Sequence, residues 1–291
     1  MKKILSTRSA PGRHWVGDGF PVHGLFGYQS GVEERSPFLL LDYAAPTRFE
    51  PTSARRGVGQ HPHRGFETVT IVYDGEVEHR DSTGQGGVIG AGDVQWMTAG
   101  AGIFHEEFHS TNFARSGGPF EMVQLWVNLP AKDKAAPPGY QAIARADIPV
   151  VELADAAGAP AGSVRVIAGR FGERSGPAHT FTPMNGWDVR VRAGHTVSLP
   201  QPEGWTSLLV VLDGAVRVNG QAALRSAQMA TLSTDGSEIS VEANADAKLL
   251  LLAGEPIDEP VVGYGPFVMD SQAGIVQAIE NFNSGKFGRM Q

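Results

Sequence analysis

The segment from His61 to Val77, HPHRGFETVTIVYDGEV, has a counterpart 139 residues later, from Pro200 to Val216, PQPEGWTSLLVVLDGAV. Each segment joins an extended run to a strand rich in aliphatic residues, and each reaches an Asp-Gly pair near its end. Asp-Gly is typical of tight hairpins, because glycine accepts the positive φ that such a turn needs. Chance similarity between two valine-rich strands is the alternative, but the aligned glycines favour an internal duplication of an all-β unit.

Composition supports short strands over the whole chain. The 291 residues include 37 Gly and 19 Pro, which favour strands joined by tight turns. The polar segment 131–141 contains Pro137-Pro138-Gly139 and is typical of a linker. We therefore expect an N-terminal domain of residues 1–135 and a C-terminal domain of residues 136–291.

One strand and one helix stand out from this pattern. In the strand predicted over residues 118–130, Val123 and Leu125 share an apolar face, whereas Gln124 and Trp126 share a mixed face, which predicts a pocket wall. Near the end of the chain, Asp270 or Ser271 can cap a helix with Ile275, Ile279 and Phe282 on one face, and Gly285 can end it. Together these features predict an all-β protein of two jelly-roll β-barrels with a short C-terminal helix.

Charge and cysteine content exclude several classes of function. The chain has 24 Lys and Arg against 31 Asp and Glu, a net charge of −7, and no long basic run for nucleic acid or anionic lipid. It has no cysteine, which excludes disulfides, iron–sulfur clusters and thiol nucleophiles. The two lysines near the start are followed only by Ile4 and Leu5, which is far shorter than the apolar core of a signal peptide. No apolar stretch approaches the roughly 20 residues that span a bilayer. We expect a cytoplasmic protein with no direct nucleic-acid or membrane partner.

Two pairs of residues point to a metal. His61 and His63 are two positions apart, and so are His105 and Glu107, while His109 extends the second alternation. Positions i and i+2 of a strand project from one face, so each pair can converge on one ion. Histidines together with a carboxylate are typical of non-haem iron sites. Ordinary surface histidines are the alternative, but two separate pairs favour a divalent metal.

The block HPHRGFETVT…DGEVEHRDSTG…GAGDVQWMTAGAGIFHEEF…QLWVNLP, together with GEPIDEPVVGYGPFVMDS…QAIENFNSGKFG, resembles the pirin family along almost the full chain. The resemblance implies two cupin domains with a metal only in the N-terminal one. It implies one divalent ion, expected to be Fe(II), with Zn, Mn, Ni, Co and Cu as alternatives. The ligands it implies are His61, His63, His105 and Glu107.

Two carboxylates compete for the role of ligand and base. Generic cupins take a glutamate four residues after the second histidine of the first motif, where Glu67 stands, whereas pirins take Glu107. Strand alternation would also place Glu67 on the inner face if the strand is regular, so both stay open. We expect Glu107 to be the ligand, with Glu67 next to the pocket, and either of them to act as the catalytic base.

Other polar positions are expected to have no part in the chemistry. His79, Asp81, Ser82 and Thr83 follow the first hairpin and are expected to be solvated. In the second half, Pro200 and Pro202 replace the first two histidines, and a looser alignment places Ser240 at the position of His105. The C-terminal domain is therefore expected to be metal-free.

The resemblance also implies an activity. Some pirins are similar in activity to quercetinase, which implies a metal-dependent dioxygenase that cleaves flavonols such as quercetin with O2. The alternative is a non-catalytic iron-binding regulatory protein that docks on a protein partner. We expect a monomer in either case.

Overall fold

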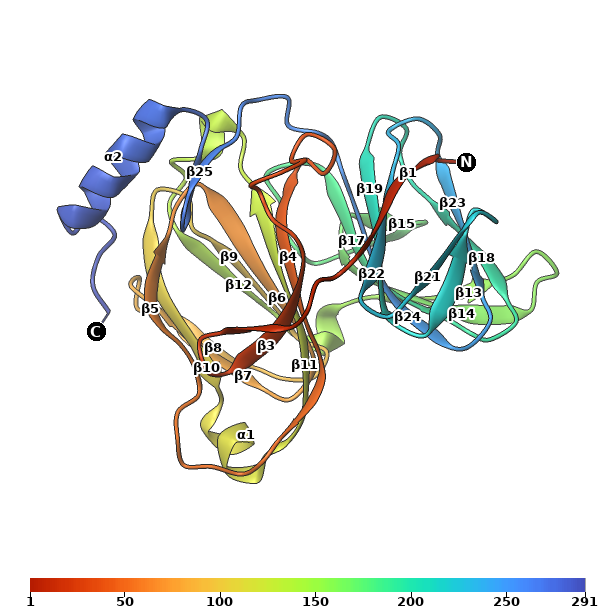
Figure 1. Ribbon diagram of the computed structural model, residues 1–291, viewed down its shortest axis with the longest axis horizontal. Coiled ribbons are helices and arrows are strands. Elements are labelled where there is room, and N and C mark those ends of the chain that lie inside the picture. The colour runs from red at the N-terminus through yellow and green to blue at the C-terminus, as the bar shows by residue number, and fades with distance from the viewer. Residues whose placement is uncertain (291) are drawn as a thin grey trace. The chain divides into compact units, whose positions relative to one another are not determined.

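The computed structural model describes residues 1–290, which form two compact β-rich units (Figure 1). The unit called the site barrel below comprises residues 12–32, 38–145 and those from 257 on. The unit called the second barrel comprises residues 1–11, 33–37 and 146–256.

The site barrel is built from two antiparallel sheets. Its larger sheet has the strand order β12 (Gly139–Ile143), β9 (Val94–Thr98), β6 (Phe66–Asp74), β11 (Gly118–Asn128), β4 (Phe38–Phe49), β3 (Phe20–Phe26) and β2 (His14–Val16). Its smaller sheet has the order β5 (Gly57–His63), β10 (Ile103–His109), β7 (Val77–Asp81) and β8 (Gly86–Ile89). The remaining elements are β25 (Val262–Tyr264), β26 (Phe267–Met269), α1 (Thr111–Ser116), α2 (Gln272–Asn283) and the 3-10 turn η1 (Ala131–Asp133).

The second barrel has the same plan. Its larger sheet has the order β1 (Ile4–Ser9), β22 (Gln228–Leu232), β19 (Thr206–Asp213), β24 (Ala247–Gly254), β17 (Met184–Val191), β14 (Pro160–Ala168) and β13 (Val150–Ala154). Its smaller sheet has the order β18 (Thr196–Pro200), β23 (Glu238–Ala243), β20 (Ala215–Val218) and β21 (Ala222–Arg225). The short elements are β15 (Arg170–Phe171) and β16 (Arg174–Ser175), and the 3-10 turn η2 (Arg145–Asp147) spans the point in the chain where one unit ends and the other begins.

The strand orders match position by position. The series β9-β6-β11-β4-β3 corresponds to β22-β19-β24-β17-β14, and β5-β10-β7-β8 corresponds to β18-β23-β20-β21. The two similar segments, residues 61–77 and 200–216, supply β6 and β19, each followed by a glycine turn with φ of +84° at Gly75 and +81° at Gly214. The predicted duplication and the two predicted jelly-roll barrels are therefore confirmed.

The compact units do not follow the chain contiguously. Strand β1 pairs with β22, so the first residues of the chain complete the second barrel. Strand β12, which begins inside the predicted linker, pairs with β9 of the site barrel. The expected boundary between residues 135 and 136 stays a prediction. In the structure, the compact unit around residues 146–256 also includes residues 1–11, and the unit around residues 38–145 also includes the residues from 257 on.

The terminal helix follows its sequence signals. Ser271 caps α2 through its Oγ, which accepts a hydrogen bond from Gly274 N at 3.1 Å. Ile275 is buried in a cluster with Phe267 and Phe287, and Ile279 and Phe282 pack against it. Figure 1 shows α2 on the outside of the site barrel next to β25. Within residues 1–290, neither α-helix has the length and apolar character needed to cross a membrane.

Candidate metal centre

Three neighbouring strands of the smaller sheet bring six polar residues to one face. His105 on β10 lies opposite His61 of β5 on one side and opposite Asp81 of β7 on the other. Glu107 on β10 lies opposite His79 of β7. Since alternate residues of a strand share a face, His63 lies on the same side as His61. Five of these residues are buried and His61 is half-buried, so this polar face lies mostly away from water.

The three histidines of the two sequence motifs meet. Their ligand nitrogens all lie within 4.8 Å of one another. The ring centroids of His61 and His105 are 4.2 Å apart, and those of His63 and His105 are 4.8 Å apart. Three imidazoles at this spacing can bind a single divalent cation.

Some ring nitrogens of this cluster have hydrogen-bond partners, whereas two have none within the described residues. His61 Nδ1 lies 2.8 Å from the Gly59 carbonyl, and His63 donates to the Pro266 carbonyl. His63 Nδ1 and His105 Nε2 are buried, and no residue of the described chain hydrogen-bonds to them. A metal ion would satisfy both lone pairs, so the cluster is compatible with a metal.

Burial also sets the protonation state of two of these histidines. Removal from water, followed by the neighbouring imidazole of His61, holds the pKa of His63 and of His105 well below the usual range. Both rings are therefore neutral at pH 7, which is the form that binds a metal.

Glu107 lies next to this cluster and faces a cavity. Its carboxylate is within 4.8 Å of the ligand atoms of His79 and His105. It accepts a hydrogen bond from Gln124 Nε2 at 3.3 Å and shares the Thr70 hydroxyl, at 3.3 Å, with Gln124 Oε1, which lies 2.7 Å from that hydroxyl. The structure therefore brings Glu107 to His105, and the same carboxylate lines a cavity that His61 and His63 also line.

This cavity is lined by strands of both sheets of the site barrel. It has a volume of about 320 Å³. Met122, Gln124 and Trp126 line it, so the mixed face of the predicted strand is confirmed as a pocket wall. Its other lining residues are Val16, Phe20, Val22, Leu40, Asp42 and Val58. A largely apolar wall with a few polar groups is typical of a small-molecule site.

Glu67 does not reach this cavity, which corrects the expected inner-face position. Thr70 of β6 hydrogen-bonds to Glu107, and Glu67, three residues earlier on a regular strand, projects from the opposite face. Its carboxylate accepts a hydrogen bond from Thr98 Oγ1 at 2.8 Å. The alternation from His63 fails because Gly65, with φ of +87°, separates β5 from β6.

His109 continues the alternation of β10 but lies among phenylalanines. Its ring centroid is 4.6 Å from that of Phe49 and 4.9 Å from that of Phe120. Its Nε2 lies 2.9 Å from the Gly19 carbonyl. Burial, the largest cause, lowers the pKa of His109, so a neutral ring that completes the aromatic core explains its position.

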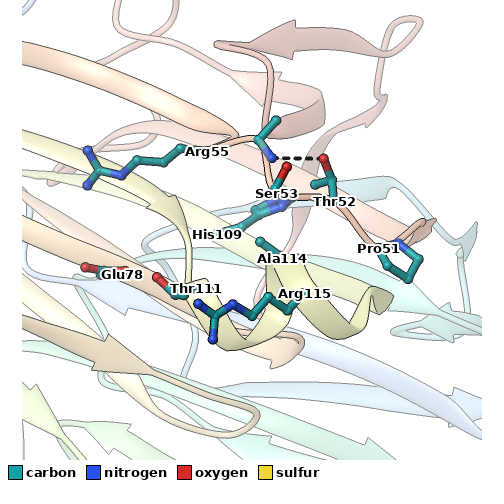
Figure 2. A pocket seen from close by; sticks show the side chains of 10 residues that line it. Pro51, Thr52, Ser53, Arg55, Glu78, His109, Thr111, Ala114 and Arg115 are labelled. Atoms are coloured by element: carbon teal, nitrogen blue, oxygen red, sulfur yellow. Dashed lines mark hydrogen bonds between the residues drawn. The ribbon is translucent and has the colours of Figure 1, made fainter.

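A second depression, of about 620 Å³, lies over His109 and α1 (Figure 2). Figure 2 shows Arg55, Glu78 and Arg115 around it, with Thr52 Oγ1 accepting a hydrogen bond from Ala54 N. Arg55 is paired with Glu106 at 2.9 Å and lies 3.7 Å from the ring centroid of Phe108. Its guanidinium is therefore already engaged, and the depression does not include the histidine cluster.

His79 and Asp81 were expected to be solvated and are instead buried, which corrects that expectation. His79 has no exposed surface, and Asp81 is 4 % exposed. Burial opposes ionisation of Asp81, but hydrogen bonds from His79 and Thr83 outweigh it and lower its pKa. The alternation Val77, His79, Asp81 is the signal that could have placed both on the inner face of a strand.

The matching face of the second barrel is apolar. Leu199 pairs with Ile239 there, and Val218 pairs with Val241, all within one hydrophobic core. Ser240 is not the counterpart of His105, since it alternates with these core residues and lies on the other face. The face that carries histidines and carboxylates in the site barrel is filled by aliphatic side chains in the second barrel.

Two jelly-roll barrels, one of which carries a histidine cluster beside an internal cavity, define a two-domain cupin with a candidate metal centre. The family model for pirin matches residues 19–127, and the model for the pirin C-terminal cupin domain matches residues 186–288. The chain therefore belongs to the pirin family.

Relatives and solved structures support this assignment. A Pseudomonas aeruginosa protein provisionally named quercetin 2,3-dioxygenase is 58 % identical over 289 residues, 99 % of each chain. A Caulobacter vibrioides pirin-like protein is 40 % identical over 261 residues, 86 % of this chain and 87 % of the relative. The crystal structure of quercetin 2,3-dioxygenase from Acinetobacter baumannii has a TM-score of 0.96 and 54 % identity, and the match covers 100 % of both chains.

Proposed function

We propose that this pirin is an Fe(II)-dependent dioxygenase that cleaves flavonols such as quercetin with O2. In this proposal one iron is held by His61, His63, His105 and Glu107. The observation that carries it is the meeting of three imidazoles, with ligand nitrogens within 4.8 Å, beside a cavity that a carboxylate also lines. The names of the Pseudomonas and Acinetobacter relatives favour the same reaction.

The cavity suits a small aromatic substrate. Its volume of about 320 Å³ lies at the lower end of the range for ligand sites, about 300–1,000 Å³. Trp126 stacks on Phe66 with ring centroids 4.2 Å apart, which gives the wall a fixed aromatic surface. Phe20 and Met122 add apolar contacts that exclude water from the reacting ring.

In this proposal Glu107 also accepts the proton of the flavonol 3-hydroxyl, and its carboxylate would loosen from the metal as the substrate binds, because a metal-bound carboxylate is too weak a base at pH 7. Its carboxylate lines the cavity, and the hydrogen bonds from Thr70 and Gln124 hold it there. A positioned base of this kind contributes a factor of roughly 10²–10⁴ to the rate. Glu67 faces away from the cavity and is not part of this proposal.

A bound divalent metal supplies the Lewis-acid and oxygen-activating chemistry that these side chains lack. Neutral imidazoles with a carboxylate suit iron, and Zn, Mn, Ni, Co and Cu are the alternatives for the same donors. The protein contributes the fixed donor set, the dry aromatic wall and the base. The expected products are a depside and carbon monoxide.

Oxygen uptake tests this function. The protein is loaded with Fe(II) under anaerobic conditions, mixed with quercetin and O2, and compared with His61→Ala treated in the same way. We expect uptake and carbon monoxide release from the wild type only. Uptake no greater than the His61→Ala background, from protein that holds one equivalent of iron, would reject flavonol cleavage and leave an iron-binding regulatory protein as the reading.

A further inference from the structure

Three buried side chains form a series of polar contacts that ends at the histidine cluster. His79 Nε2 lies 3.4 Å from Asp81 Oδ2, and His79 Nδ1 lies 3.4 Å from His105 Nδ1. His105 Nε2, on the other side of its ring, has no partner within the described chain. The order is therefore Asp81, His79, His105 and then the space between the candidate ligands.

The first two members of this series, Asp81 and His79, are held in place. Asp81 Oδ1 accepts hydrogen bonds from Thr83 N at 2.8 Å and from Thr83 Oγ1 at 2.6 Å, so its Oδ2 is turned to His79. The ring of Tyr140 stacks on His79 at an interplanar angle of 7° and a centroid distance of 5.3 Å. Since His79 and His105 have no exposed surface, water does not compete for their nitrogens.

Hydrogen-bond directions then determine the tautomers. An ionised carboxylate only accepts hydrogen bonds, so it selects the His79 tautomer that carries its proton on Nε2. The Nδ1 of that ring has a lone pair, which accepts a hydrogen bond only from a protonated His105 Nδ1. In this tautomer the lone pair of His105 lies on Nε2.

We propose that Asp81 and His79 are positioning residues that hold His105 as its Nδ1–H tautomer, with Nε2 directed to the metal. The inference rests on the metal-binding part of the proposed function. A backbone carbonyl orients the ring of His61, and another orients the ring of His63. In His105 the hydrogen-bonded pair of Asp81 and His79 orients the ring instead.

His79 is not itself proposed as a ligand. It lies within 4.8 Å of ligand atoms of His105 and Glu107, so proximity alone would allow that role. Both of its nitrogens already have partners, however, in Asp81 and His105. Its ring lies behind His105 and acts through it.

The first test needs no variant. Nitrogen NMR of histidine-labelled, metal-free wild type reports which ring nitrogen of each histidine carries the proton. We expect a protonated Nδ1 on His105 and a protonated Nε2 on His79. A protonated Nε2 on His105 would overturn the proposal, and this result does not depend on whether the protein binds iron.

The second test uses Co(II) as a spectroscopic probe, titrated in competition with a chelator. His79→Phe keeps a stacking ring but removes the acceptor, and we expect Co(II) affinity to fall about 10–100-fold. His79→Asn keeps an acceptor near the Nδ1 position and should recover most of the affinity. Asp81→Asn presents a donor to His79, selects its other tautomer, and should weaken binding as His79→Phe does.

The control is His179→Phe, an exposed histidine of the second barrel, which should bind Co(II) like the wild type. Thermal unfolding of the metal-free variants separates loss of fold from loss of positioning. Equal affinity of His79→Phe and the wild type would overturn the proposal. Failure of the wild type to bind Co(II) or Fe(II) would instead reject the metal-binding function, and the NMR result would still decide the tautomer.

Discussion

Glu67 and Glu107 are both buried in the site barrel, but different groups surround them. Glu107 accepts hydrogen bonds from Thr70 and Gln124 beside the cavity, whereas Glu67 accepts one from Thr98 on the opposite face of β6. Burial, the largest cause, raises the pKa of Glu67 to about 7, although the hydrogen bond from Thr98 opposes the rise. Glu107 therefore lies beside the cavity, whereas Glu67 lies in the core on the other face of the strand.

Substitution by glutamine separates these roles. Glu107→Gln should lower quercetin-dependent oxygen uptake by about 10²–10⁴-fold, because it removes the proposed base, which is also a proposed iron ligand. Glu67→Gln should leave uptake within about twofold of the wild type, since its side chain does not line the cavity. Both variants are assayed at equal iron content. A loss of activity in Glu67→Gln as large as in Glu107→Gln would contradict the assignment.

The pKa of Glu67 also predicts how stability changes with pH. In the unfolded chain this carboxyl ionises near its ordinary value of 4.5, and in the folded protein only near 7. Between these values the folded state binds more protons, so the contribution of Glu67 is present below pH 4.5 and is lost as pH rises to 7. The shift corresponds to about 3 kcal/mol.

Urea unfolding of Glu67→Gln and the wild type between pH 4.5 and 8 measures this loss. The free energy of unfolding of the variant, relative to the wild type, should rise by up to about 3 kcal/mol over that range. A constant difference at all pH values would show that the carboxyl titrates alike in both states.

The sequence correctly predicted the inward-facing side chains that alternate within one strand. It failed where a turn interrupts the alternation. The pairs His61/His63 and His105/Glu107 are each uninterrupted by a turn, and all four residues lie on the inner face. The inference from His63 to Glu67 crossed Gly65, whose positive φ changes the alternation. The role of Asp81 depends on its pairing with β10, which one sequence does not specify.

Lys134, at the C-terminal end of η1, links three elements of the site barrel. It is 4 % exposed, and its Nζ donates to the carbonyls of Gly65 and Val268 and to Asn128 Oδ1 at 2.9–3.1 Å. These acceptors lie next to β6, in β26 and in β11. The ammonium therefore joins the C-terminal hairpin to the barrel near His63.

Lys134→Met should destabilise this barrel, because it leaves three buried acceptors without their donor. We expect a loss of about 1–3 kcal/mol in the free energy of unfolding, measured by urea denaturation of the metal-free protein. The matched control is Lys132→Met, an exposed lysine of the same turn, which should change stability by less than about 0.5 kcal/mol. Equal effects of the two substitutions would contradict this role.

Elements with local signals were predictable, and those defined by distant pairing were not. The capping serine and the spacing of Ile275, Ile279 and Phe282 specify α2 locally. Strand β12 begins at Gly139, directly after two prolines, and its local composition is that of a linker. It becomes a strand because β9 offers it a free edge, which is information from another part of the chain.

The first eleven residues of the chain belong to the second barrel, which residues 146–256 mainly build. Strand β1 covers the edge of β22. Lys2 is buried, and its Nζ donates to the carbonyls of Trp205, Ser233 and Thr234. No local pattern in the sequence relates residues 1–11 to β22, so a contiguous division of the chain was the natural expectation.

Deletion of residues 2–11 should therefore weaken the second barrel selectively. We expect faster amide hydrogen exchange in β22 and β19, and a tendency to associate through the uncovered edge of β22. Exchange in β10 should change little, since that strand belongs to the site barrel. Unchanged exchange in β22 would contradict the assignment of β1 to this barrel.

The metal content of the protein purified without added metal, determined for the wild type and for His105→Ala, tests whether the histidine cluster binds a metal. Two groups of residues bring their potential ligand atoms within 4.8 Å of one another, namely His61, His63 and His105, and His79, His105 and Glu107. His105 belongs to both groups, so its removal disrupts either one. We expect about one equivalent of a divalent metal, iron, in the wild type and almost none in the variant. A wild type without any divalent metal, or a His105→Ala protein that retains a full equivalent, would contradict this expectation.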